Sequence, residues 1–190
     1  MGIESHSVSA FEKLMEAVPV ITREVMIETL AYLGEQCVTR IRDRSGEESW
    51  FDQTGNLRSS IGYLIIDNGA TIVDFGFNPD FGKPARKEKV EFVTKDGKEV
   101  SFLASKPGGG PEGAQKGKVY AQSLVTLYSK GLTLLIVAGM DYADAVEARD
   151  GKDVLASTEL WAKQEAPRLM ERAKEKIERR IAQLQKQLGL

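Results

Sequence analysis

The dipeptide Asn68-Gly69 is the feature that most constrains the fold of this chain. Both residue types tolerate the positive φ angles of a tight type I′ turn, and an apolar run flanks the pair on each side. The pattern predicts an antiparallel hairpin formed by residues 61–67 and 71–77. At least part of the chain is therefore expected to be an antiparallel sheet.

A second turn pair, Asp96-Gly97, predicts another hairpin. Its strands, residues 89–95 and 98–103, alternate apolar and polar residues, which is typical of a half-exposed ribbon. Gly and Pro dominate residues 104–118 and predict a mobile loop. Residues 119–131 follow as an amphipathic helix whose expected anchors are Val119, Leu124, Leu127 and Tyr128.

Long helical patterns occupy both ends of the chain. Residues 8–44 repeat apolar side chains at helical spacing, and Pro19 predicts a break between a short helix and a long one from about residue 20. Residues 158–188 form one apolar stripe, and Pro167 is expected to start or kink that helix. Before it, the apolar run 132–139 predicts a buried central strand.

Together these elements predict an α+β fold. We expect a mainly antiparallel sheet of about four strands, a long N-terminal helix, a long C-terminal helix, and an inserted β-hairpin and loop. A length of 190 residues with 42% apolar residues suits one domain over 1–190, with residues 78–130 as the insertion.

Residues suited to catalysis or metal binding are scarce. His6 is the only histidine and lies in a region expected to fray, and Cys37 is the only cysteine and lies on the apolar face of a helix. A Ser-His-Asp triad, an intrachain disulfide and a multi-cysteine metal site are therefore not expected. We expect no cofactor, no metal, no catalytic residue and no small-molecule substrate, and a reducing, cytoplasmic site of synthesis.

Two further segments superficially suggest ligands. The Gly-rich stretch 107–118 lacks the Gly-Lys-Ser/Thr of a phosphate-binding loop. The acidic residues of 141–153 are spaced by three, unlike the alternating ligands of an EF-hand, which predicts a solvated face. There is no signal-peptide pattern, and the most apolar window, 131–140, is too short to span a bilayer.

Two short motifs carry more information. TGNLRSSI, residues 54–61, follows the long N-terminal helix and precedes the hairpin, while MDYADAVE, residues 140–147, follows a strand and precedes the C-terminal helix. This order resembles the small neck and tail-completion (head–tail joining) proteins of lambda-like long-tailed phages. In that family T-G-x-L-R-x-S precedes the sheet and Y-A-x-x-V-E follows the last long strand. The matching residues are Thr54, Gly55, Asn56, Leu57, Arg58, Ser60 and Ile61, then Tyr142, Ala143, Val146 and Glu147.

The resemblance covers residues 8–77 and 131–188 and leaves out the insertion. The chain also departs from the family in having Ala148-Arg149 where a small residue, often Gly, commonly follows the glutamate. The resemblance implies a non-enzymatic virion protein, made in the host cytoplasm, that forms a homo-oligomeric ring. Its implied partners are phage neck, connector or tail-tube proteins, with no membrane and at most non-specific contact with DNA.

Several motif residues have plainer interpretations. Arg58 could pair with Glu147 or be a surface charge, and Tyr142 is expected to pack its ring on the core. Trp50 and Phe51 are expected to anchor the long helix to the sheet, and Trp161 to lie in the core.

Two other classes of function stay open. One is a cytosolic nucleic-acid-binding or protein-interaction module that uses the basic C-terminal helix, although the net charge of −2 argues against phosphate as the main partner. The other is a small enzyme, which would need a pocket with convergent polar groups. The basic residues in the last part of that helix, residues 174–186, are Lys174, Lys176, Arg179, Arg180 and Lys186.

Overall fold

The computed structural model describes residues 4–44, 50, 53–148 and 152–190, with side chains from Val8 onward. These residues form two compact units, Met1–Leu33 with Glu159–Leu190 (unit 1) and Gly34–Thr158 (unit 2). The fold is α+β with antiparallel sheets and long helices at both ends, which confirms the predicted class. The strands divide into a sheet of three and a ribbon of two, where a main sheet of about four was expected.

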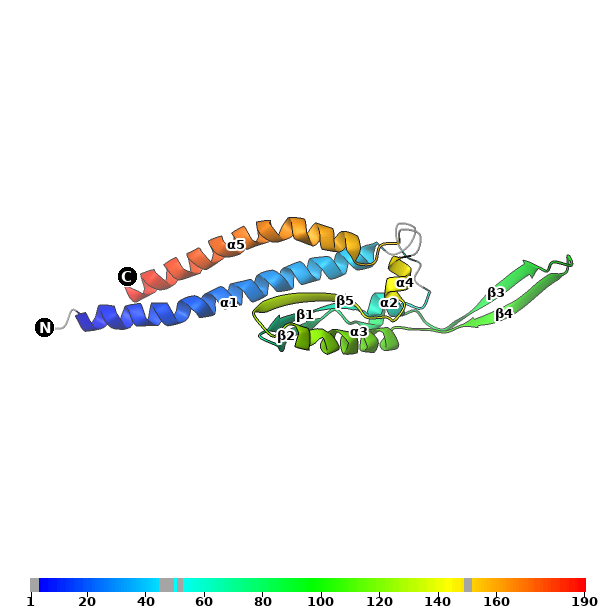
Figure 1. Cartoon of the computed structure of the whole chain (residues 1–190), viewed down its shortest axis with the longest axis horizontal. Coiled ribbons are helices and arrows are strands. Elements are labelled where there is room, and N and C mark those ends of the chain that lie inside the picture. The colour runs from blue at the N-terminus through cyan, green and yellow to red at the C-terminus, as the bar shows by residue number, and fades with distance from the viewer. Residues whose placement is uncertain (1–3, 45–49, 51–52, 149–151) are drawn as a thin grey trace. The chain divides into compact units, whose positions relative to one another are not determined.

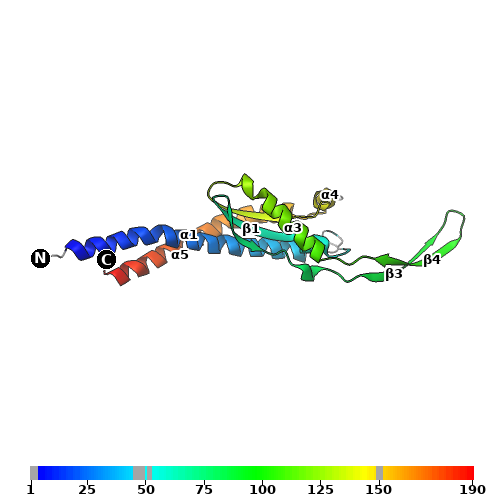
Figure 2. The same cartoon turned by 90° about the horizontal axis from the view of Figure 1, so that it is seen from below.

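Unit 1 is an antiparallel pair of helical segments. They belong to α1 (Glu4–Asp43) and α5 (Ala156–Leu188), which run side by side in both views (Figures 1 and 2). Lys176 Nζ lies 2.6 Å from Glu28 Oε2, and Arg180 reaches Glu28 Oε1 at 3.0 Å. The hydrogen bond from Lys176, followed by that from Arg180, holds the pKa of Glu28 below its ordinary value. These exposed ion pairs show which residues of the two helices lie opposite each other.

The predicted break at Pro19 is wrong, because α1 continues through it. A proline inside a helix removes one backbone hydrogen bond and crowds the preceding turn, and a helix of 40 residues retains enough other bonds to continue. Pro167 likewise lies inside α5, which begins at Ala156, so it does not start that helix. The expected apolar face of α1 is also only partly used: Leu14 is buried, whereas Phe11 and Met15 stay more than half exposed.

The sheet of unit 2 has the order β2-β1-β5, and every pairing is antiparallel. Its strands are β1 (Ile61–Asp67), β2 (Ala70–Phe75) and β5 (Leu132–Ala138). Asn68 and Gly69 have φ angles of 48° and 83°, which confirms the predicted hairpin turn. The expectation of a central strand at 132–139 is wrong: β1 is central and almost wholly buried, while β5 is at the edge.

Helix α3 (Pro111–Leu124) covers one face of this sheet, and the short helix η2 (Val125–Leu127) extends it. The predicted mobile loop 104–118 is therefore wrong over most of its length, because β4 and α3 occupy it. Two of the four expected anchors are wrong, since Val119 and Leu127 are 63% and 70% exposed, whereas Leu124 and Tyr128 pack against the apolar core as predicted. The buried face of α3 consists of small residues, Gly113, Ala114, Gly117 and Ala121. Small side chains let the helix backbone approach the sheet closely, and a conventional apolar pattern does not reveal such a face.

The ribbon consists of β3 (Arg86–Val93) and β4 (Glu99–Lys106), each longer than predicted. Both views show it leaving the α2 end of unit 2 and running away from the three-stranded sheet (Figures 1 and 2). Three short helices complete the unit: α2 (Asn56–Ser59), η1 (Pro79–Phe81) and α4 (Ala143–Glu147). Among the described residues, no helix is both long enough and apolar enough to cross a membrane.

Candidate assembly surfaces

Asn56 of the first motif joins α2 to the Gly-rich segment before α3. Its side-chain oxygen accepts a hydrogen bond from the N–H of Gly110 at 2.6 Å, and its amide nitrogen donates to Glu112 at 3.2 Å. The hydroxyl of Thr54 accepts the N–H of Asn56 at 3.2 Å. Asn56 is buried, so these bonds replace water for its polar groups. The motif is thus a joint between segments far apart in the sequence.

Glycines make this joint possible because backbones meet there directly. Gly55 precedes α2 with φ of 82°, and a Cβ atom on it would lie 2.3 Å from the carbonyl oxygen of Phe81. A Cβ atom on Gly113 would lie 2.1 Å from the carbonyl oxygen of Asn56. Such distances exclude any side chain unless the backbone moves. The Gly-rich composition that suggests mobility in the sequence therefore permits close packing.

Arg42, near the end of α1 in unit 2, ties together three carbonyl groups. Its guanidinium donates to the carbonyl oxygens of Ile61 at 2.8 Å and Arg58 at 3.3 Å, and also to that of Gly76. It also lies 4.1 Å from the centre of the Phe81 ring. Burial, followed by the nearby charge of Arg58, lowers the pKa of Arg42 to about 10. Sequence reasoning missed this residue because its partners are backbone groups, which leave no pattern in the sequence.

The second motif places its residues in different surroundings. Ala143 is buried, whereas Tyr142 is 42% exposed, so the expectation that its ring packs on the core is wrong. One carboxylate oxygen of Glu147 accepts the N–H groups of Leu155 at 3.2 Å and Ala156 at 2.7 Å. Since α5 begins at Ala156, Glu147 caps the first turn of that helix.

The two motifs come together around one cavity of about 490 Å³. Thr54, Asn56 and Leu57 line it from the first motif, and Tyr142 and Val146 line it from the second. At its rim Lys116 bridges Glu112 at 3.2 Å and Asp141 at 3.3 Å, and these two carboxylates, Glu112 first, raise the pKa of Lys116. The first motif runs into β1 and the second follows β5, and these two strands pair, so both motifs flank the same sheet.

The remaining motif and aromatic residues serve mainly in packing. Ser60 is buried, and its hydroxyl donates to the carbonyl of Leu57 at 2.8 Å. The guanidinium of Arg58 lies 5.8 Å from the centre of the Trp50 ring. Trp50 is buried, while Phe51 lies outside the described residues. Trp161 is half-buried, which is less than the expected core position.

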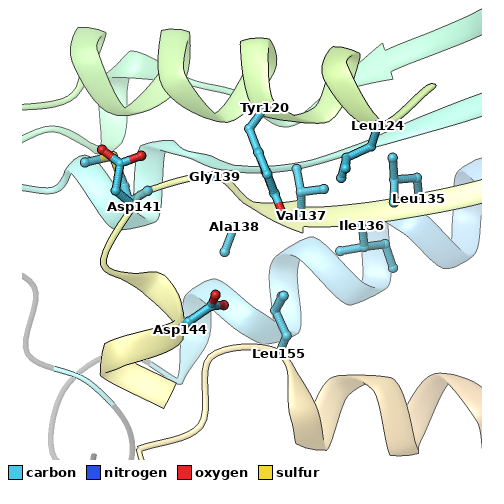
Figure 3. Close-up of a pocket in the computed structure, with 11 residues that line it drawn as sticks. Tyr120, Leu124, Leu135, Ile136, Val137, Ala138, Gly139, Asp141, Asp144 and Leu155 are labelled. Carbon is cyan, nitrogen blue, oxygen red and sulfur yellow. The ribbon is translucent and has the colours of Figure 1, made fainter. Parts of the chain in front are cut away.

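The described residues of unit 2 expose apolar groups at several places, and two of these are an extended ribbon and a groove. The first is the ribbon, where Phe92, Val93, Phe102 and Leu103 are 49–65% exposed. The second is a groove of about 240 Å³ along β5, shown in Figure 3. Tyr120 and Leu124 of α3 form its upper wall in that view, and Asp144 and Leu155 lie on the other side of the strand.

Within the described residues, no cluster of three or more His, Cys, Asp or Glu side chains could hold a metal ion. Cys37 is buried, as predicted, and burial raises its pKa to about 11. His6 lies in α1 rather than in a frayed segment, and its side chain is outside the described part. Comparisons with protein-family models, with curated proteins and with solved structures give no match to this chain.

Proposed function

We propose that this chain is a non-enzymatic structural subunit of a phage or prophage head–tail neck or tail terminus. In this proposal it acts by assembling into a ring with copies of itself and by contacting neighbouring neck, connector or tail-tube proteins. The two sequence motifs support the family, and their convergence on one cavity is compatible with a shared architectural role.

The observation that carries the proposal is the β3–β4 ribbon. A two-stranded ribbon alone is at best marginally stable in water, yet this one has exposed Phe92 and Val93 on one strand and Phe102 and Leu103 on the other. Burying the remaining surface of four half-exposed apolar side chains would contribute about 1 kcal/mol each. Exposed apolar groups gathered on a projecting element are typical of a surface that another protein covers.

A ring requires contacts in which one patch of a subunit meets a different patch of the next. Unit 2 offers two unlike patches, the ribbon and the β5 groove. This is the geometry that a head-to-tail contact needs, whereas a single self-complementary patch favours a two-fold dimer.

The proposal is tested by the state of the purified protein and by its genomic neighbourhood. We expect mass photometry to show concentration-dependent oligomers and negative-stain images to show rings. Genes for a portal, a capsid or a tail tube are expected beside this one. A protein that stays monomeric at every concentration, and that does not co-purify with a portal, neck or tail protein, contradicts the proposal.

Nucleic-acid binding by the basic end of α5 is the alternative. Two of its five basic residues, Lys176 and Arg180, already pair with acidic residues of α1, which reduces the charge left for phosphate groups. Binding of duplex DNA at low salt that weakens steeply as salt is added would favour this alternative.

A further inference from the structure

The outer edge of β5 carries unused backbone groups. Gly139 N–H bonds to the Ser60 carbonyl at 3.3 Å, and Asn68 N–H bonds to the Gly131 carbonyl at 3.0 Å. In an antiparallel pair, residues alternate between bonding to the partner strand and pointing away from it. The one-to-one register with β1 therefore turns the N–H and C=O groups of Leu134, Ile136 and Ala138 to the outer edge. Among the described strands, β5 pairs with β1 alone.

A groove of about 240 Å³ lies along this edge. On the side of α3 it is lined by Leu135 and Val137 of β5, beneath Tyr120 and Leu124, and Val137 is buried in an apolar core cluster. On the opposite side Ile136 and Ala138 point toward Leu155 and Asp144 (Figure 3). Asp141 and Asp144 give the Gly139 end of the groove a negative charge, and both are exposed. An incoming strand therefore needs apolar side chains at one end and basic ones at the other.

Strand β3 has that character. Thr94 N–H bonds to the Lys98 carbonyl at 2.9 Å, so the same alternation turns the backbone groups of Lys89, Glu91 and Val93 to the outer edge of the ribbon. Its end near the turn is apolar, with Phe92 and Val93 exposed. Its start is exposed and carries a net positive charge, with Arg86, Lys87 and Lys89 against the one acidic residue Glu88.

We propose that β3 of a second copy of this chain adds antiparallel to the outer edge of β5, with Glu91 opposite Ile136. The proposal rests on the ring assembly above and identifies the contact that joins neighbouring subunits. Backbone pairing of a strand with an exposed sheet edge is a common mode of recognition. Because each copy gives a ribbon and receives one, the contact is head-to-tail and can close into a ring.

This register satisfies both faces of the groove. Phe92 lies opposite Leu135 and Val90 opposite Val137, so the two apolar residues face α3. Lys89 lies opposite Ala138, on the face where Asp144 lies. Arg86 continues past the end of β5 toward Asp141, which also pairs with Lys116 at 3.3 Å. Glu91 meets the apolar Ile136, but it shares its face with Lys89, which already pairs with it at 2.5 Å.

Charge distinguishes β3 from the other strand of the ribbon. An antiparallel β4 with Leu103 opposite Ile136 would place Glu99 opposite Met140 and Lys98 opposite Asp141, so it brings one acidic and one basic residue to the acidic end of the groove. The start of β3 brings three basic residues and one acidic residue, Glu88, and opposite charges at an interface favour association. The ribbon of the same copy is held away from its own groove. Lys83 N–H bonds to the Thr54 carbonyl at 2.8 Å, and Gly109 N–H bonds to the Lys83 carbonyl at 2.9 Å, which fixes the base of the ribbon.

The test uses two variants that each gain one cysteine beside Cys37, Glu91→Cys and Ile136→Cys, carrying different affinity tags and mixed under mild oxidation. Directly opposed residues of a bonded antiparallel pair have Cα atoms about 5.5 Å apart, which a disulfide spans. Only contact between copies can join the two proteins. Cys37 is fully buried with a pKa of about 11, so it does not compete. We expect a disulfide-linked heterodimer of twice the 20.9-kDa chain mass.

Matched controls define the outcomes. Ser101→Cys, which lies opposite Glu91 across the ribbon, should join Ile136→Cys about tenfold less. Equal or stronger joining by Ser101→Cys overturns the choice of β3. Efficient homodimers of Ile136→Cys alone would mean pairing of two β5 edges, and internal cross-linking of a Glu91→Cys/Ile136→Cys double variant would mean that a ribbon occupies its own groove. Either result overturns the proposal.

Exchanging the charges of two residues tests the same contact without cysteines. Lys89→Glu, on an exposed strand, should weaken association about tenfold, and adding Asp144→Lys should restore most of it. Failure of this rescue contradicts the proposed register. Wild-type oligomers that form without the Glu91–Ile136 cross-link would reject this contact and leave the ring proposal standing, whereas a strictly monomeric wild type would reject both.

Discussion

Gly113→Ala separates two interpretations of the Gly-rich segment by the sign of its effect on stability. If the segment were mobile, or simply helical, alanine would raise the free energy of unfolding by up to about 1 kcal/mol, because glycine is the poorer helix former. In the folded chain, however, the new Cβ atom would lie 2.1 Å from the carbonyl oxygen of Asn56. The nearest atoms all belong to the backbone, so no side-chain rotation relieves the clash.

The magnitude follows from the distances. An ordinary contact begins at 3.4 Å, so α3 must move away from α2 by about 1.3 Å, the difference between 3.4 and 2.1 Å. A shift of that size lengthens the 2.6 Å bond between Gly110 and Asn56 beyond hydrogen-bonding range. Overpacking costs about 1–3 kcal/mol and a buried broken bond a similar amount. After the gain in helix propensity, we expect a net loss of about 2–4 kcal/mol.

Thermal and urea unfolding followed by circular dichroism measure this loss. For a chain of this length it corresponds to a fall in Tm of about 5–15 °C. Gln115→Ala, at an exposed position of the same helix, is the matched control and should change stability by a few tenths of a kcal/mol. A Gly113→Ala variant as stable as the wild type, or more stable, would refute the close-packing argument.

Four further outcomes follow from individual contacts. Arg42→Met should lower the free energy of unfolding by about 2–4 kcal/mol, because buried carbonyls lose a charged donor. Arg42→Lys should lower it by a smaller amount. A urea midpoint for Arg42→Met equal to that of the wild type would contradict the role given to Arg42. Glu147→Ala should lose about 1 kcal/mol by uncapping α5, and Glu147→Gln less, as judged by urea midpoints. Burial opposes the charged form of Asp153, but hydrogen bonds from Ser157 and the charge of Arg44 outweigh it and lower its pKa. The stability from Asp153 is therefore present above its ordinary pKa and lost as the pH falls through the folded value, so Asp153→Asn should flatten the acid limb of a stability–pH curve. Cys37, with a pKa of about 11, should be about one part in a thousand thiolate at pH 8. Native protein should therefore react with a thiol reagent only as fast as it unfolds. Rapid labelling of native protein would show that the thiol is accessible.

The parts of the fold that local chemistry determines were predictable from the sequence. The hairpin at Asn68-Gly69 is one, because its turn requires two residues with positive φ and the flanking apolar runs then pair without further choice. The two terminal helices are another. Their boundaries were less predictable, since Pro19 removes one hydrogen bond from a helix that many others sustain.

The features of the fold and of the site that could not be predicted from the sequence depend on contacts between distant segments. Glycine is common both in mobile loops and where helices pack closely, so the presence of Gly113 in the sequence does not distinguish a loop from a closely packed helix. An apolar run such as β5 fits a central strand, but a helix over one face makes an edge strand equally apolar. The carbonyl partners of Arg42 have no sequence signature. Asn56 was recognisable as a motif residue, but its partners at Gly110 and Glu112 required the fold.

The ion pair between Glu28 and Lys176 has a consequence for synthesis. Its two residues are separated by 148 positions, and a ribosome adding about 5–20 residues per second needs roughly 7–30 s between them. Residues 34–158 can meanwhile fold as they emerge, whereas the first part of α1 waits with Leu14 and Val25 uncovered. Unit 1 is thus the last part of the chain to fold during translation, and its early half is the segment on which a nascent-chain chaperone is expected to act.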